Sequence, residues 1–387
     1  MVTALDYWTR RSPYFEAARR AGCKGWSVAN HMYQPHSYDD PLREYDHLVN
    51  GVTLWDVATE RQVEIAGPDA EAFVDLLTPR EIRSVRPGRC RYLIITSEEG
   101  GIVNDPVMLR LAEDRFWLSC SDSDLILWAK GVAVFAGMDV RIHEPDVSPL
   151  QLQGPKSYPV IETLFGRAVA DLGYYRLSET TLDGIPLVVT RTGWSGEFGY
   201  ELFLQDSRRA DDLWDAVLAA GKPHGIAVTG PSDIRRVEAG ILGYRCDIDL
   251  YVNPFEAGMD RLVDLDKPAA FIGKKALAAI KRDGVRRRIV GIEVGGDALP
   301  PGVFENRWPA FADGRHVGEI LVALHSPRLG KNIGYAMVET ALAAPGTPLT
   351  VGAPLGDRDA VVVPFPFVAP SRSRESIETH STRRHGT

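Results

Sequence analysis

Two kinds of hydrophobic pattern alternate along the chain, one with strand spacing and one with helical spacing. Residues 62–79, "QVEIAGPDAEAFVDLLTP", predict a strand, a Gly-Pro turn and a helix that Asp69 caps and Pro79 ends. The residues expected on the buried face of this helix are Phe73, Leu76 and Leu77. Residues 150–166, "LQLQGPKSYPVIETLFG", repeat the same order of elements. The repetition indicates related α+β units rather than a doubly wound parallel sheet.

Strand patterns dominate the segment between these two units. "CRYLIITSEEGGIVNDPVMLRLAEDRFWLSCS" predicts three strands, with hairpin connections at "EEGG" and "AEDR", and therefore an antiparallel sheet. Further on, "ADDLWDAVLAAGK" predicts an amphipathic helix that Gly221 closes. "PSDIRRVEAG" predicts another helix, with Ser232 at its N-cap and Gly240 at its end.

The C-terminal part of the chain changes character. From about Arg286 onward, "RRRIVGIEV", "HVGEILVAL", "IGYAMV" and "TPLTV" are short strand patterns between Gly and Pro turns, which predicts an all-β domain. The final residues, "PSRSRESIETHSTRRHGT", are polar and lack aromatic anchors. Because such a segment buries too little surface to offset its ordering entropy, we expect a disordered tail over residues 370–387.

Length, charge and cysteine content narrow the functional classes. A chain of 387 residues suggests two or three domains, and its formal net charge of −8 argues against a nucleic-acid partner. No apolar run reaches membrane-spanning length and the N-terminus has no signal-peptide core, so we expect a cytoplasmic protein. The four cysteines and nine histidines show no metal-ligand spacing, which predicts no metal and no disulfide framework. Phosphate-loop, dinucleotide-binding and hydrolase motifs are also absent.

Three segments carry candidate chemistry, each with a plainer alternative. Asp105 precedes Pro106, which limits where the carboxylate points, but the residue types alone favour a turn. "RTGWSGEFGYELFL", residues 191–204, surrounds Trp194 with glycines that let a flat ligand approach, and it also fits a glycine-rich hairpin. The N-terminal segment is aromatic, which suits either a cationic ligand or core packing. His31 in "ANHMYQP" fits either a packed histidine or a catalytic one.

Eight segments occur in an order that resembles a known family. They are "LWDVATERQVEIAGPDA", "GGIVNDPVM", "LQGPKS", "RTGWSGEFGYEL", "RRVEAG", "NPFEAGMDRLVDLDK", "FIGKKAL" and "SPRLGKNIGYAMV". Together they resemble the folate-dependent aminomethyltransferases, the T-protein of the glycine cleavage system and its relatives. Within that family, "ERQVEI", "TPREI", "VNDPV", "SDSDLILWAKG" and "EPDVSPLQLQGPKS" are most similar to the branch that demethylates dimethylsulfoniopropionate.

The resemblance implies an α+β fold with a T-protein-like three-domain arrangement, antiparallel sheets and a C-terminal β-barrel-like domain. It divides the chain into a folate-binding α+β domain in two segments, residues 1–50 and 145–265, and a second α+β domain, residues 51–144. The C-terminal all-β domain then spans residues 266–369, and the tail follows it.

The resemblance also implies roles for individual residues. Asp105 matches the functional aspartate of the family, and Tyr92, Trp194 and Glu201 match residues that contact folate. The substrate-side candidates are Ser119, Tyr33, His31, Phe203 and the pair Tyr174 and Tyr175.

Three positions depart from the family's patterns. Asn104 stands where T-proteins have a first aspartate, Ser232 stands where they have a folate-contacting arginine, and Phe203 replaces a tyrosine of the sulfonium demethylase. The resemblance therefore supports the fold more strongly than it supports the identity of the substrate.

The implied activity is a tetrahydrofolate-dependent methyl transfer. The donor would be a small sulfonium, quaternary amine or methoxy compound, tetrahydrofolate would accept the methyl group, and 5-methyltetrahydrofolate would be the product. Two alternatives stay open: an aminomethyltransferase that forms 5,10-methylenetetrahydrofolate, and a folate-binding protein without turnover. The expected partners are the small-molecule donor and folate, with neither nucleic acid nor membrane, and the sequence leaves a homo-oligomer open.

Overall fold

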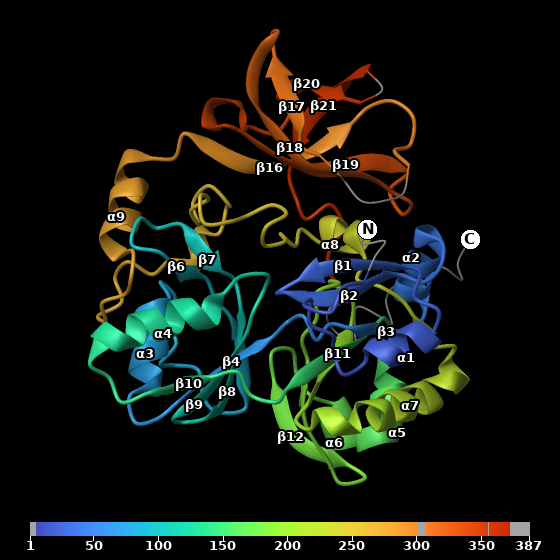
Figure 1. The fold of residues 1–387 in the computed structure, drawn as a ribbon. Coiled ribbons are helices and arrows are strands. Elements are labelled where there is room, and N and C mark those ends of the chain that lie inside the picture. The colour runs from blue at the N-terminus through green and yellow to red at the C-terminus, as the bar shows by residue number, and fades with distance from the viewer. Residues whose placement is uncertain (1–4, 301–305, 355, 372–387) are drawn as a thin grey trace.

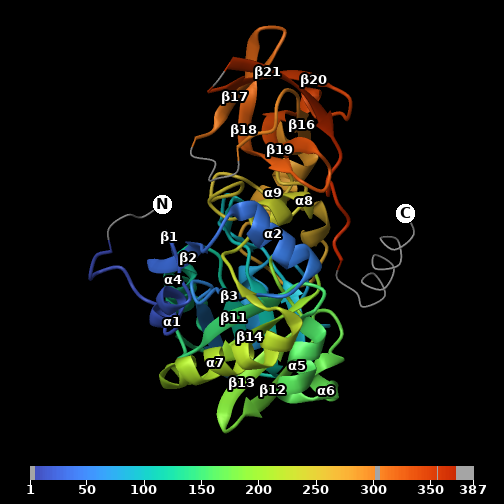
Figure 2. The same ribbon diagram turned by 90° about the vertical axis from the view of Figure 1, so that its right-hand side faces the viewer.

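The computed structural model describes residues 5–300, 306–354 and 356–371. Two α+β bodies lie side by side and a β-barrel sits above them (Figures 1 and 2). Each α+β body is built on an antiparallel sheet, apart from one parallel edge strand, and the C-terminal barrel has six strands. The predicted fold class, α+β with antiparallel sheets and a C-terminal barrel, is confirmed.

The first body is a six-stranded sheet whose helices cover one face. In spatial order its strands are β12 (Leu177–Leu182), β13 (Ile185–Thr190), β14 (Gly199–Leu204), β11 (Ser148–Gln153), β3 (Thr53–Asp56) and β15 (Ala227–Val228). The covering helices are α1 (Phe15–Arg20), α5 (Ser157–Phe165), α6 (Arg167–Ala170) and α7 (Ala210–Gly221), which share one apolar core with the sheet. A two-stranded hairpin, β1 (Gly25–Ala29) and β2 (Met32–Ser37), packs on the same core.

The second body is a five-stranded sheet with its own helical layer. Its strands, in spatial order, are β10 (Arg141–His143), β4 (Gln62–Ala66), β9 (Arg115–Ser119), β8 (Val107–Ala112) and β5 (Arg89–Tyr92). Helices α3 (Ala70–Leu77) and α4 (Leu125–Ala136) pack with this sheet in a separate apolar core. A small two-stranded sheet, β6 (Ile95–Thr96) and β7 (Ile102–Asn104), lies between β5 and β8 in the chain.

The two sheets face each other across a third apolar layer. This layer contains Cys90, Leu109, Leu111 and Trp117 from the five-stranded sheet, and Leu177, Val188 and Phe203 from the six-stranded sheet. Because side chains alternate between the two faces of a strand, the faces turned away from this layer pack against the helices. On β14, for example, Phe203 lies in the layer while Leu202 packs in the core of the first body.

The remaining chain forms the barrel and its supports. The barrel strands, in spatial order, are β16 (Arg287–Val294), β19 (Lys331–Glu339), β18 (Arg315–Ser326), β17 (Trp308–Ala312), β20 (Pro348–Ala353) and β21 (Gly356–Val363). Helices α2 (Pro41–Asn50), α8 (Asp233–Glu238) and α9 (Lys274–Asp283) lie outside these sheets, as do the short 3-10 helices η1 (Ser207–Arg209), η2 (Lys222–His224), η3 (Asp260–Leu262) and η4 (Thr340–Leu342). α8 contacts the barrel, since the Tyr335 hydroxyl donates to the carbonyl oxygen of Val237 at 3.0 Å.

Several local predictions hold. Both strand-turn-helix units form, as β4 with α3 and β11 with α5, and α7 ends at Gly221 as predicted. Ser232 caps α8 by accepting a hydrogen bond from the backbone N–H of Arg235 at 3.3 Å, and Gly240 follows the helix with a positive φ of 71°. All four cysteines are free, and two of them are buried.

Three local predictions are wrong in detail. Asp69 precedes α3 but does not cap it, because its carboxylate instead accepts from the backbone N–H of Asp139 at 2.8 Å. The segment predicted as three strands contains five, β5 to β9, with hairpins at both predicted connections. Asp105 and Pro106 form a link between β7 and β8 of different sheets rather than a turn, and the chain reverses at residues 98–100.

The division into domains stays a proposal, with two observations that bear on it. β3 pairs with β11 in the six-stranded sheet, so the strand just after residue 50 joins the sheet of the first unit. At the other end, Ser371 is buried and its N–H donates to Gly196 at 2.8 Å. The rest of the predicted tail, residues 372–387, lies outside the described residues.

Gly101, just before β7, gives a test of this packing. A Cβ at Gly101 would lie 1.9 Å from the backbone carbonyl oxygen of Leu250, so the chain could not hold both segments in place. We expect Gly101→Ala to destabilise the protein by about 1 to 3 kcal/mol, the usual cost of overpacking. Thermal or guanidinium unfolding of the purified variant measures this.

The matched control is Gly131→Ala within α4, where an added Cβ meets no atom within 4 Å. Alanine is the better helix former by up to about 1 kcal/mol, so this variant should be as stable as the parent or slightly more stable. Equal stability of the Gly101→Ala variant and the parent would contradict the close approach of these segments.

Candidate active site

The polar residues of the site lie on the strand faces that turn toward the layer between the two sheets. On β14, Glu201 is two residues from Phe203, which lies in this layer, and on β9, Ser119 is two residues from Trp117. On β5, Tyr92 is likewise two residues from Cys90. Because side chains on a strand repeat every second residue, the strands themselves turn Glu201, Ser119 and Tyr92 toward the side of this layer, and Tyr92, the last residue of β5, packs against the neighbouring apolar cluster that contains Ile102 and Tyr335.

Asp105 is buried beside this group and held by two hydroxyls. Tyr92 Oη donates to its Oδ2 at 2.8 Å, and Ser121 Oγ donates to its Oδ1 at 2.5 Å. Burial raises the pKa of Asp105 to about 6, although both hydrogen bonds favour the carboxylate and lower the pKa. The side chain can therefore exchange a proton near neutral pH, as a general base requires.

Asn104 fixes the loop that carries Ser121. Its Nδ2 donates to the carbonyl oxygen of Ser121 at 3.1 Å and to Ser123 Oγ at 2.7 Å, and its Oδ1 accepts from the N–H of Ser121 at 3.2 Å. An ionised aspartate at this position would have no N–H for the carbonyl of Ser121. The departure at Asn104 thus has a structural reason: this chain needs an amide there.

Glu201 is buried and forms an acidic pair with the half-buried Glu60, a residue that the sequence did not single out. Gln151 Nε2 donates to Glu201 Oε1 at 2.6 Å and to Glu60 Oε1 at 3.1 Å. The other oxygen of Glu201 accepts from Thr192 and, at 3.5 Å, from Thr190. Ser119 hydrogen-bonds to Glu60, and Gln62 Nε2 donates to Ser119 Oγ at 3.0 Å.

The electrostatics of this pair are unfavourable in the free protein. Two oxygens that contact one nitrogen lie within about 6 Å, where unit charges repel by about 3 kcal/mol at an effective dielectric constant of about 20. Burial raises the pKa of both groups, and the pKa of Glu60 is further raised by the charge of Glu201. Within residues 5–300, 306–354 and 356–371, no lysine or arginine forms an ion pair with either carboxylate. The pair therefore favours a ligand with N–H donors or positive charge.

The sequence does contain a signal for this network. Gln62, Gln151 and Gln153 interrupt apolar strand patterns with amides, and each is buried in the structure. Buried amides need partners, so their presence in strands points to a polar network inside the protein. The partner Glu60 lies in the turn before β4, and only the three-dimensional arrangement shows that it faces Gln151.

Trp194 lies at the edge of the site and is half-buried. Its backbone N–H donates to Gln151 Oε1 at 3.4 Å, which connects the glycine-rich loop to the acidic pair. The guanidinium of Arg236 lies 5.4 Å from the centre of its ring. Ser232 is the N-cap of α8 and, as a serine, carries no positive charge. The cation beside Trp194 is instead Arg236, which lies one turn later in α8.

The substrate-side candidates are placed differently from one another. Ser119 is buried and bonded within the network of Glu60. Phe203 is fully buried in the layer, with its ring 6.3 Å from that of Trp117. Tyr175 packs against the same layer and accepts a backbone hydrogen bond from Cys90 at 2.9 Å.

The two N-terminal candidates are not in hydrogen-bond contact with Asp105 or Glu201 in the described part of the chain. Tyr33 packs in the core of the first body, and its hydroxyl accepts from the N–H of Asp6 at 2.7 Å. His31 is exposed, and its Nε2 lies 3.1 Å from Asp124 Oδ1.

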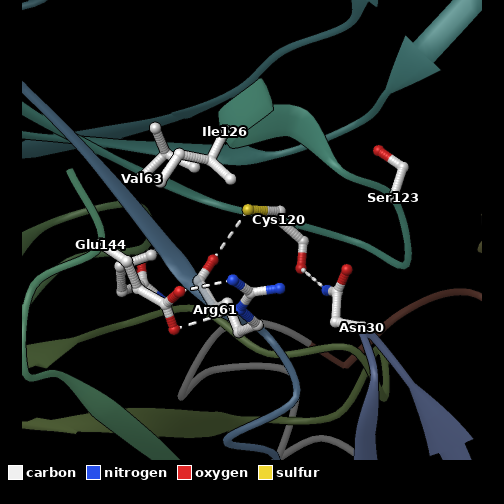
Figure 3. Close-up of a pocket in the computed structure, with 8 residues that line it drawn as sticks. Asn30, Arg61, Val63, Cys120, Ser123, Ile126 and Glu144 are labelled. Atoms are coloured by element: carbon white, nitrogen blue, oxygen red, sulfur yellow. Dashed lines mark hydrogen bonds and ion pairs between the residues drawn. The ribbon is translucent and has the colours of Figure 1, made fainter. Parts of the chain in front are cut away.

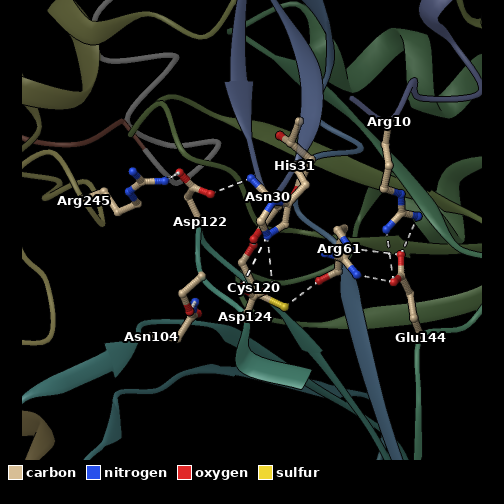
Figure 4. A network of polar contacts seen from close by, with 12 residues as sticks. Arg10, Asn30, His31, Arg61, Asn104, Cys120, Asp122, Asp124, Glu144 and Arg245 are labelled. Atoms are coloured by element: carbon tan, nitrogen blue, oxygen red, sulfur yellow. Dashed lines mark hydrogen bonds and ion pairs between the residues drawn. The ribbon is translucent and has the colours of Figure 1, made fainter. Parts of the chain in front are cut away.

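A small pocket adjoins the site behind β4 (Figure 3). Its lining includes Asn30, Arg61, Cys120 and Glu144, and Arg61 forms an ion pair with Glu144. Arg10 binds the same carboxylate at 2.8 Å, so two arginines neutralise Glu144 and lower its pKa to about 2. Figure 4 shows the ion pairs that Glu144 makes with both arginines, whereas the acidic pair has no such partner among the described residues.

Neither a metal-binding cluster nor a membrane-spanning helix occurs in the described part of the chain. The described ranges contain no cluster of three or more histidine, cysteine, aspartate or glutamate side chains suited to a metal ion. Within the same ranges, none of the helices is long and apolar enough to cross a membrane.

Comparisons with known proteins give the same family. Residues 14–267 match the GCVT N-terminal domain, and residues 287–369 match the glycine cleavage T-protein C-terminal barrel domain. Dimethylsulfoniopropionate demethylase DmdA from Ruegeria pomeroyi is 39% identical over 353 residues, which is 91% of this chain and 96% of the relative. The aminomethyltransferase from Symbiobacterium thermophilum is 32% identical over 361 residues, with 88% and 92% covered.

A solved structure shows the same fold. The glycine cleavage system aminomethyltransferase T from Bartonella henselae superposes with a TM-score of 0.83 at 24% identity, over 94% of this chain and 99% of that one. On the strength of both domain matches and these relatives, the chain belongs to the aminomethyltransferase (glycine cleavage T-protein) family of tetrahydrofolate-dependent one-carbon transferases.

Proposed function

We propose that this protein is a tetrahydrofolate-dependent demethylase. It takes a methyl group from a small donor, a dimethylsulfoniopropionate-like sulfonium, a quaternary amine or a methoxy compound, and forms 5-methyltetrahydrofolate. The observation that carries the proposal is the site itself: a buried aspartate with a pKa of about 6 lies near the acidic pair of Glu201 and Glu60, which has no counter-cation in the described residues. The 39% identity to a dimethylsulfoniopropionate demethylase supports a methylated donor.

The residues present fit the pterin ring of tetrahydrofolate. Glu201 and Glu60 are acceptors held in place by Gln151, and the pterin edge presents amino and ring N–H donors. We infer that Glu201 holds this edge, while Tyr92 and Trp194 contact the ring. When bound, tetrahydrofolate supplies the nucleophilic nitrogen that takes up the methyl group.

Asp105 has the chemistry that the transfer requires. As a sulfonium methyl group leaves, the C–S electron pair stays on sulfur, and positive charge moves toward the acceptor nitrogen. A carboxylate there stabilises the transition state more than the ground state and then accepts the proton that the nitrogen releases. Ser121 and Tyr92 orient Asp105 for this role by donating to its two oxygens.

A second candidate function rests on the aminomethyltransferases among the relatives. It would use the same folate site but form 5,10-methylenetetrahydrofolate from an aminomethyl or N-methyl donor. Mass spectrometry of the folate product separates the two, after incubation of the protein with tetrahydrofolate and a panel of S-, N- and O-methyl donors. Tight folate binding with neither product would instead indicate a binding protein without turnover.

Asp105→Asn tests the proposed base. The amide keeps the shape of the side chain but can neither carry the negative charge nor accept the proton, so we expect kcat to fall about 100-fold or more. The parent rate should also fall as the pH drops below about 6, since protonation of Asp105 removes the carboxylate. Methyl-transfer kinetics across this pH range measure both effects.

The control for this variant is Asp215→Asn, a matched change at an exposed position on α7. Its kinetics should equal those of the parent. Unchanged turnover in the Asp105→Asn variant would rule out the assigned role.

Glu60→Gln tests whether charge repulsion in the acidic pair destabilises the folded protein. In the folded protein the pKa of Glu60 is raised, so the free energy of unfolding of the parent falls as the pH rises above the pKa of the unfolded chain. Glutamine has no charge to bury. The variant should therefore gain in Tm over the parent as the pH rises from about 4.5 to 8, by about 2 °C or more.

Thermal unfolding at several pH values, without folate, measures this difference. Glu98→Gln, at an exposed position in the β6–β7 connection, is the control and should show no pH-dependent gain. If the Tm difference between Glu60→Gln and the parent stays constant with pH, ionisation of Glu60 does not destabilise the folded protein.

A further inference from the structure

The tip of the β1–β2 hairpin lies against the loop that contains Cys120 and Asp122 (Figure 4). Ala29 pairs with Met32, so Asn30 and His31 form a two-residue turn, and both have positive φ, 49° and 61°. Such a turn joins tightly twisted strands, and asparagine is one of the few residues that adopts it readily. The turn therefore explains an asparagine at position 30 but does not explain where its side chain lies.

The side chain of Asn30 is buried, with 3% of its surface exposed. Its Nδ2 donates to the carbonyl oxygen of Thr59 at 2.8 Å and to that of Ser121 at 2.9 Å. Its backbone N–H donates to Asp122 Oδ1 at 2.5 Å. One amide group thus connects the hairpin to two loops that are far apart in the sequence.

Both of these loops supply groups to the site. Thr59 directly precedes Glu60, which accepts from Gln151, and Ser121 donates to Asp105. The carbonyl oxygen of Ser121 also accepts from Asn104. The side-chain amides of Asn30, in the N-terminal hairpin, and Asn104, at the end of β7, therefore both hold this peptide unit.

We propose that Asn30 is a positioning residue of the active site, whose amide fixes the Ser121 hydroxyl on Asp105 and the Glu60 carboxylate on Gln151. The inference rests on the proposed role of Asp105. Asn30 itself touches neither of the reacting groups and acts through the peptide units of Thr59 and Ser121.

Loss of the Asn30 amide should raise the pKa of Asp105. The hydrogen bond from Ser121 lowers the pKa of Asp105, so a loop that no longer holds Ser121 in place lets this pKa rise. The other groups that face Asp105 come from different elements: Tyr92 on β5, Glu60 before β4, and Tyr244 and Asp247 after α8. Asn30 makes no hydrogen bond with Tyr92, Tyr244 or Asp247 among the described residues, so its effect passes through the two peptide units that it holds: Ser121, which donates to Asp105, and Thr59, which precedes Glu60.

Two variants remove the amide and keep the turn. Asn30→Gly accepts the positive φ at no steric cost but has no side-chain donor. Asn30→Asp keeps the shape and the tolerance for this backbone but has no N–H for the two carbonyls. Asn30→Gly is the deciding variant, because the new charge of Asn30→Asp can by itself raise the pKa of Asp105. If Asn30→Gly does not fold, an unchanged midpoint in Asn30→Asp still overturns the inference, since both the lost N–H and the added charge would raise that midpoint.

The control is Asp183→Gly. Asp183 and Gly184 form the two-residue turn of the β12–β13 hairpin with φ of 48° and 79°, and the Asp183 side chain is exposed. The substitution therefore makes the same backbone change at a hairpin turn whose side chain holds no loop.

The readout is the titration of the Asp105 carboxyl carbon by NMR in protein labelled with ¹³C-aspartate, assigned with the Asp105→Asn variant. We expect the midpoint in Asn30→Gly and Asn30→Asp to move up by about half a pH unit or more, and that of Asp183→Gly to match the parent. In methyl-transfer assays, kcat should fall about tenfold in both Asn30 variants, and KM for tetrahydrofolate should rise about twofold or more, because Glu60 is one of the acceptors proposed for the pterin edge.

A lowered Tm with an unchanged midpoint in both Asn30 variants would overturn the inference, since it would show a purely structural role. The titration needs no turnover, so it separates the two proposals. If the parent protein transfers no methyl group, the proposed function fails, and the midpoint still decides whether Asn30 positions Ser121.

Discussion

The apolar layer between the two sheets is the constraint on which the rest of the site depends. It keeps water from the polar groups at its edge, and a carboxylate in such a place is costly unless hydrogen bonds replace its hydration. Here hydroxyls and amides supply those bonds: Tyr92 and Ser121 to Asp105, and Gln151 to Glu201 and Glu60. Because these donors are neutral, the bonds do not cancel the cost, and the pKa values of the acids stay raised. In the free site, ionising these acids is therefore unfavourable, and a ligand with N–H donors or positive charge would lower that cost.

The same layer explains why the site needs support from distant segments. Each sheet packs on its own helices, but the groups that meet between the sheets come from the loops and strand ends of both. Asn104 and Asn30 hold the Ser121 loop, and Tyr45 and Ser326 both donate to Glu238, which joins α2, α8 and the barrel. Buried hydrogen bonds of this kind act over large separations in the chain and allow few alternative geometries.

The fold was largely predictable because its main signals are local. Neighbouring residues set the hydrophobic periods of residues 62–79 and 150–166 and the caps of α8. The structure has the strands, the helices and these caps as predicted. The errors occur where a distant partner decides the outcome. Asp69 binds Asp139 instead of its own helix, and the Asp105–Pro106 link changes sheet instead of turning. Glu60 was missed for the same reason, since its partner Gln151 is contributed by β11. The resemblance supplied Asp105 and Glu201 as candidates, and the contacts in the structure supply the reasons for their chemistry.

The position of Phe203 bears on the kind of donor. A hydroxyl two residues after Glu201 could serve as an acid for a leaving group, but here a phenyl ring fills that place and is sealed against Trp117. Ser119, the hydroxyl nearby on β9, is already bonded to Glu60 and Gln62. A methoxy compound or a neutral amine leaves poorly without a proton, whereas a sulfonium leaves as a neutral thioether and needs none. For the proposed methyl transfer, the lack of a free hydroxyl beside Glu201 among the described residues therefore favours an onium donor over a methoxy donor.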